Sequence, residues 1–99
     1  MNYIKTEWKV SENEPKNMQK LLSFNENQLI QIQLLAGKEI STHKAGTDAL
    51  IIVRKGKVQF TVEGKEIVIT NHDILYLEPD ENHSIIALED TELLLVKIR

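Results

Sequence analysis

Three histidines are the side chains in this chain best suited to binding or proton-transfer chemistry. His43 lies shortly before an apolar run, and His83 begins a strand-like stretch. His72 instead lies in Asn71-His72-Asp73, a sequence typical of a solvated hairpin turn. A neutral imidazole donates and accepts hydrogen bonds, exchanges protons near about pH 6.5 and ligates metal ions. His43 and His83 are therefore the candidate ligand-binding residues, and His72 is expected to stay outside the site.

Most other reactive groups are excluded. The chain has no cysteine, so disulfides, thiolate metal sites and cysteine nucleophiles are absent. No serine stands in the Gly-x-Ser-x-Gly pattern of an acyl-transfer nucleophile, and no glycine-lysine pair belongs to a phosphate-binding loop. A net charge of −3 argues against a nucleic-acid partner. The sequence thus identifies no catalytic residue, and the histidines remain as binding groups.

The elements that must position these histidines are strands. Polar and apolar residues alternate strictly along Lys57–Val62, which places Val58 and Phe60 on one face. Glu63-Gly64 after this run is typical of a tight hairpin turn. The other strand-like stretches are residues 28–35, 48–54, 66–70, 74–77, 84–88 and 92–98. Short strands at this spacing predict an all-β sandwich or barrel with little helix.

Two of these stretches are apolar on both faces, namely residues 50–53 and 93–96. Such strands must be covered on two sides, either at the centre of the protein's own sheet or by a second subunit. We therefore expect a homodimer. In residues 28–35 the apolar side chains share one face, and Gln31 and Gln33 are expected on the other, in contact with solvent.

The N-terminal residues differ from the rest. Residues 1–27 are polar, lack clear alternation and contain Pro15, so we interpret them as an arm that packs on the barrel of residues 28–99 or on a partner subunit. The apolar residues that would anchor this arm are Tyr3, Ile4, Trp8 and Val10. A second stretch, containing Met18, Leu21 and Leu22, has the spacing of one helical turn.

Residues 35–99, which include the histidines and the turns around them, resemble a small single-domain cupin. The first cupin motif contains two histidines and a glutamate between two glycines. In this chain Gly37, His43 and Gly56 are in register with that motif. Ala45 stands at the position of the second histidine, and Ala49 at that of the glutamate. In the second motif His83 is in register. The positions that depart from the second motif are His72, Glu78, Asp80 and Ala87.

The resemblance implies a double-stranded β-helix, or jelly roll, and in many members a metal ion held by three histidines and one glutamate. This chain keeps two of the four ligands, His43 and His83, whereas stable protein sites usually supply three or four. Asp48 is next to the glutamate position, but alternation points it to the opposite face. We therefore expect no tightly bound cofactor, or at most a divalent transition metal held weakly by the two histidines.

The resemblance also implies a function. It places His43 and His83 in one concave mouth, where a small-molecule ligand would bind. Tyr76, on the same strand face as Ile74 and Glu78, is a further candidate ligand-binding residue, with a core or interface position as the alternative. The alternatives are a metal-dependent oxygenase or isomerase with a reduced ligand set, and a non-catalytic dimerisation or effector-binding module. The longest apolar run, Ala49–Val53, is too short to cross a membrane, and no signal-peptide segment is visible, so we expect a cytoplasmic protein.

Overall fold

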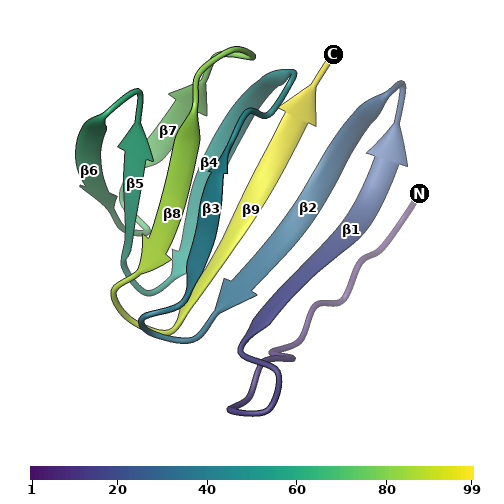
Figure 1. Ribbon diagram of the computed structural model, residues 1–99. Coiled ribbons are helices and arrows are strands. Elements are labelled where there is room, and N and C mark those ends of the chain that lie inside the picture. The colour runs from purple at the N-terminus through teal and green to yellow at the C-terminus, as the bar shows by residue number, and fades with distance from the viewer.

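The computed structural model describes all residues, Met1–Arg99, and consists of nine strands in two antiparallel sheets, without a helix. The five-stranded sheet has the order β1-β2-β9-β4-β7, and the four-stranded sheet has the order β3-β8-β5-β6 (Figure 1). No helix is long and apolar enough to cross a membrane. The strands are β1 (Lys16–Phe24), β2 (Asn27–Leu34), β3 (Glu39–His43), β4 (Asp48–Lys55), β5 (Val58–Val62), β6 (Lys65–Ile69), β7 (Ile74–Leu77), β8 (His83–Ala87) and β9 (Thr91–Ile98).

The core lies between the two sheets and is built by alternation along the strands. In β5, Val58 and Phe60 are fully buried, whereas Gln59 and Thr61, which alternate with them, are partly exposed, as predicted. The four-stranded sheet covers the β4, β7 and β9 part of the larger sheet, while β2 and β1 extend beyond it (Figure 1). The side chains of the core cluster come from both sheets: Ile32, Leu34, Ala49, Ile51, Val53, Val58, Phe60, Ile69, Leu77, Ile85, Ala87, Leu93 and Leu95.

Two turns with left-handed backbone conformations connect these strands tightly. Glu63 and Gly64 have φ angles of 47° and 81° and join β5 to β6, which confirms the predicted hairpin. Gly56, between β4 and β5, has φ +86°, and a Cβ atom there would lie 2.3 Å from the carbonyl oxygen of Asp90. Only glycine allows the chain to pass this closely from the larger sheet to the smaller one.

The N-terminal 27 residues divide into two parts. Residues 16–24 form β1, which pairs with β2, so this stretch belongs to the sheet and contains no helical turn. The helix-like spacing has a physical cause, because a bulge between Lys20 and Leu22 adds one residue to the strand. The added residue, Leu21, interrupts the alternation of polar and apolar side chains. Ahead of β1, only Val10 of the first fifteen residues is buried.

Residues 6–10 lie on the outer face of the five-stranded sheet. The Gln33 side chain accepts a hydrogen bond from the Lys9 backbone N–H at 2.9 Å and donates to the Glu7 carbonyl at 2.9 Å. Gln33 is consequently fully buried, Gln31 is fully buried as well, and the prediction that they face solvent is wrong. The alternation placed them on the outer face correctly, but it contains no information about the segment that covers that face.

Candidate functional site

Strands β3 and β8 bring the two predicted histidines together. His43 and His83 are directly paired across the two strands, and their ring centroids are 4.2 Å apart with the planes tilted by 59°. Directly opposed residues share one face of a sheet, and His83 and Ile85 both face the interior. The histidine pair therefore lies on the inner side of the four-stranded sheet, at the end where β3 stops and β8 begins.

A bulge in β3 is what aims His43 inward. Ile40 pairs with Ile85 and His43 with His83, so β3 advances three residues while β8 advances two. Without the extra residue, alternation from the inward-facing Ile40 would direct His43 to the outer face. The meeting of the two imidazoles thus depends on an irregularity of strand pairing.

The two histidines have different surroundings. His83 is only 3% exposed and lies near the ring of Phe60, at a centroid distance of 6.5 Å, whereas His43 is exposed. Burial lowers the pKa of His83, and the nearby imidazole of His43 lowers it further, while the carbonyl of Glu81 opposes this shift. His83 is therefore held in the neutral form, at the inner end of a pair whose outer member contacts solvent.

Backbone carbonyls orient both rings in the same way. The Nδ1 of His43 lies 2.8 Å from the carbonyl oxygen of Ser41, and the Nδ1 of His83 lies 3.3 Å from that of Glu81. Because a carbonyl oxygen only accepts hydrogen bonds, each contact assigns the ring proton to Nδ1. The Nε2 atom of each neutral ring is then left with a free lone pair, which can accept a hydrogen bond or ligate a metal.

The surrounding residues do not complete a metal centre. The other two family ligand positions hold Ala45, which packs against the core, and the fully buried Ala49. Asp48 lies on the outer face of β4, where its carboxylate accepts a hydrogen bond from Tyr76 at 2.6 Å. No three histidine, aspartate or glutamate side chains gather closely enough to hold an ion. The pair supplies two nitrogen ligands, which is fewer than the three or four protein ligands that a metal site usually has.

The structure does not bring Tyr76 to the histidines. In β7, Leu77 faces the core, so its neighbour Tyr76 points outward and is 53% exposed. Its hydroxyl donates to Asp48, and this bond raises the pKa of the phenol. Tyr76 belongs to the outer face of the five-stranded sheet, which is the opposite side of the core from the histidine pair.

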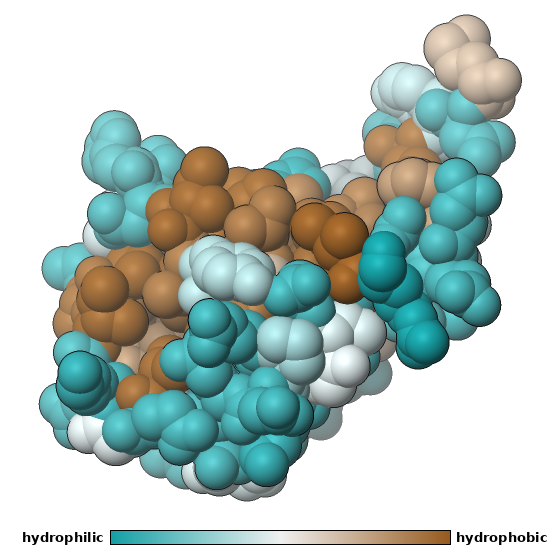
Figure 2. Space-filling view, turned by 90° about the horizontal axis from the view of Figure 1, so that it is seen from above, coloured by the Kyte–Doolittle hydropathy of each residue, from teal (hydrophilic) through white to brown (hydrophobic).

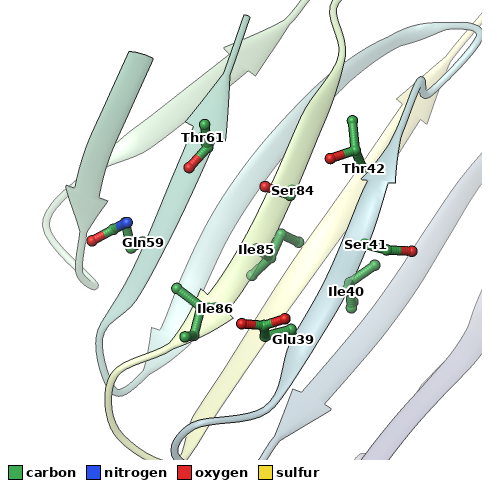
Figure 3. A pocket seen from close by; sticks show the side chains of 9 residues that line it. All are labelled: Glu39, Ile40, Ser41, Thr42, Gln59, Thr61, Ser84, Ile85 and Ile86. Atoms are coloured by element: carbon green, nitrogen blue, oxygen red, sulfur yellow. The ribbon is translucent and has the colours of Figure 1, made fainter. Parts of the chain in front are cut away.

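A hollow of about 440 Å³ is on the outer face of β3, β8 and β5. Its outward side chains are mostly polar (Figure 3), and we call this surface the hydroxyl face: Ser41, Thr42, Gln59, Thr61 and Ser84. Neither histidine lines this hollow or the other two, so the pair is part of the inner wall and not the floor of an open cavity. The alternation that marked Phe60 as inward already marked Gln59 and Thr61 as outward.

Comparison with known proteins agrees with the motif positions. The family model described as "Cupin domain" matches residues 31–98 and so includes both histidines. No match was found among curated proteins.

Solved structures with the same fold span most of this chain. A cupin superfamily protein from Desulfitobacterium hafniense DCB-2 has a TM-score of 0.84 at 18% identity, covering 92% of this chain and 83% of its own. A conserved protein of unknown function from Streptococcus pyogenes has a TM-score of 0.81 at 20% identity, covering 100% and 96%. An RmlC-like cupin from Methanocaldococcus jannaschii, described as a double-stranded β-helix, has a TM-score of 0.77 at 20% identity, covering 97% and 92%. At these identities the likeness shows the double-stranded β-helix fold.

Proposed function

This chain belongs to the cupin domain family, and on that premise we propose that it binds a small polar molecule through His43 and His83. The observation that supports the proposal is that both rings are oriented in the same way, each by a backbone carbonyl at its Nδ1. This leaves the two Nε2 atoms for a ligand, and the ring centroids are 4.2 Å apart. Because His83 is only 3% exposed, the ligand would approach from the side of the exposed His43. A histidine that only fills space in the core does not need an exposed partner of the same type beside it.

The protonation states define the chemistry of the ligand. In the neutral pair both Nε2 atoms accept hydrogen bonds, so the ligand must supply donors, such as two hydroxyl groups. A small molecule with hydroxyl groups therefore matches the pair, and it is bound without a metal ion.

The proposal is tested by nuclear magnetic resonance of the imidazole nitrogens during titration with small polyols, sugars and hydroxy acids. We expect at least one of these probes to shift the Nε2 signals of His43 and His83, and His43→Ala to abolish binding. His72→Ala is the matched control, because His72 is exposed in a turn away from the pair. If no probe moves the two signals, or if the control variant weakens binding equally, the proposal is wrong.

A further inference from the structure

The inner face of the five-stranded sheet carries a row of polar side chains at one end. Cross-strand pairing places Ser23 beside Gln28 and Gln28 beside Lys97. Lys97 is in turn paired with Ala49, which is fully buried in the core. Because directly paired residues share one face of a sheet, the three polar side chains point to the inner side. They lie where β1 and β2 extend beyond the smaller sheet (Figure 1).

This row lines a hollow of about 330 Å³, which we call the cationic hollow. Its lining contains no hydrophobic residue and consists of Ser23, Glu26, Gln28, Thr47, Lys97 and Arg99. Figure 2 looks onto this end of the molecule from above and shows hydrophilic residues there beside a hydrophobic region. The volume is at the lower end of the range of about 300–1,000 Å³ for small-molecule pockets, so the hollow has room for a small ligand.

The polar groups around the cationic hollow have no partners within the protein. The Lys97 ammonium forms neither an ion pair nor a hydrogen bond, and the side chains of Ser23 and Gln28 form no hydrogen bond. The Oγ1 atom of Thr47 is buried and has no hydrogen-bond partner. Buried polar atoms are nearly always satisfied in folded proteins, so an unpartnered hydroxyl in the wall of a hollow indicates a ligand that would satisfy it.

The charges in the cationic hollow sum to +1. Glu26 lies 4.0 Å from Arg99 and balances that guanidinium. Asp48, at the start of β4, lies on the outer face and is bonded to Tyr76, so it does not reach Lys97. The charge of Lys97 is therefore left uncompensated, in a chain whose net charge is −3.

The position of Lys97 in β9 also indicates a role in the hollow. The preceding inward residues of this strand, Leu93 and Leu95, are buried in the core. The outward neighbours of Lys97 are Val96 and Ile98, which are apolar. A lysine that served only to keep the sheet soluble would be expected at one of these outward positions, where its ammonium meets water without crossing the inner side.

We infer that the cationic hollow binds a small oxyanion, namely the carboxylate or phosphate group of a small molecule. Lys97 would supply the charged donor, and the amide of Gln28 and the hydroxyl of Thr47 would supply neutral ones. An ammonium has three N–H donors and no acceptor, so its complement is a group with several acceptor oxygens and a negative charge. Neither histidine lines this hollow, and the inference is therefore independent of the function proposed for the histidine pair.

The test is a titration of the full chain with sodium phosphate or sodium malonate at constant ionic strength, followed by nuclear magnetic resonance of the Gln28 side-chain amide. We expect a saturable shift with a dissociation constant of about 1 mM, because one charge-assisted contact dominates. Lys97→Gln should raise this constant about tenfold or more, whereas Lys97→Arg should stay within about threefold of the wild type. The tighter of the two probes identifies the group as phosphate or carboxylate.

Lys38→Gln is the matched control, because it removes the same charge from an exposed residue that follows the end of β2, whereas the hollow is at the beginning of that strand. It should leave the dissociation constant unchanged, and an equal loss would reduce the effect to overall charge and overturn the inference. No saturable shift with either probe up to about 20 mM, roughly twenty times the expected constant, would also overturn it. His43→Ala should bind the anion like the wild type, so failure of the histidine proposal is distinguishable from failure of this one.

Discussion

The two outer faces of this sandwich differ, although the inner faces are built alike. Strands β4 and β5 both direct fully buried aliphatic or aromatic residues inward, such as Ile51 and Phe60. On the outside, however, β4 presents Leu50 and Ile52, whereas β5 presents Gln59 and Thr61. The inner residues serve the fold in both sheets. The difference outside therefore reflects what each sheet presents beyond the shared core: a mostly polar hollow on the smaller sheet and an apolar surface on the larger one.

The histidine pair belongs to neither outer face. It lies on the inner wall of the smaller sheet, where Ile85 and His83 alternate with the outward Ser84. Along this one strand, the side chains proposed to bind a ligand and those of the hydroxyl face thus point in opposite directions. Substitutions on one side should leave the other side unaffected, which allows the faces to be compared experimentally.

The largest expected effect contrasts the two sides of β5. Phe60→Ala removes a fully buried ring and should lower the free energy of unfolding by about 3–5 kcal/mol, measured by urea denaturation. Thr61→Ala, the next residue on the outward side, should change it by no more than about 0.5 kcal/mol. A loss below about 1 kcal/mol for Phe60→Ala would show that its face is assigned wrongly.

The next effect compares glutamines on the two outer faces. Gln33 bonds the backbone of Glu7 and Lys9 and also the carboxylate of Glu92, so Gln33→Ala leaves partly buried groups unpartnered and should cost about 1–3 kcal/mol. Gln59→Ala, on the hydroxyl face, should cost about 0.5 kcal/mol or less. Equal losses in urea denaturation would mean that the N-terminal segment does not stabilise the larger sheet.

A smaller effect concerns pH and the inner wall. Because the folded protein lowers the pKa of His83, the unfolded chain binds the proton more readily. The stabilising contribution is complete above the unfolded pKa of about 6.5 and decreases as the pH falls through the folded pKa. Stability should thus fall on acidification below about pH 6.5, and His83→Gln should remove this part of the dependence. The control His72→Gln should retain it, and a pH dependence unaltered by His83→Gln would contradict the assignment.

The smallest expected effect is that of metal ions. With two nitrogen donors, zinc or nickel at micromolar concentration should raise the melting temperature by only about one or two degrees, because stabilisation grows only logarithmically with the ratio of ligand concentration to its dissociation constant. A rise of about ten degrees that His43→Ala abolishes and His72→Ala does not would contradict this expectation and identify a metal site.

Several features of the fold and site were predictable because they are local. Alternation with a period of two identified seven of the nine strands, the inward Phe60 and the hairpin at Glu63-Gly64, and each depends on residues close together in the chain. It missed β1 and β3, and both of these strands contain a bulge that interrupts the alternation. The positions of His43 and His83 relative to the glycine turns were enough to identify the family, because its motifs are read along the sequence. Tyr76 was less predictable, because alternation assigned its face correctly relative to Ile74 but did not show which face was the inner one.

The sequence by itself determined the strand pattern, the family and the pair of histidines to examine. Only the tertiary structure decided that these histidines meet, because the extra residue in β3 that turns His43 inward arises from pairing with β8, which is distant in the chain. The same reason explains the burial of Gln33 beneath the N-terminal segment. Alternation records which side chains share a face, whereas register, bulges and coverage depend on the partner strand or segment, and these are set only when the whole chain folds.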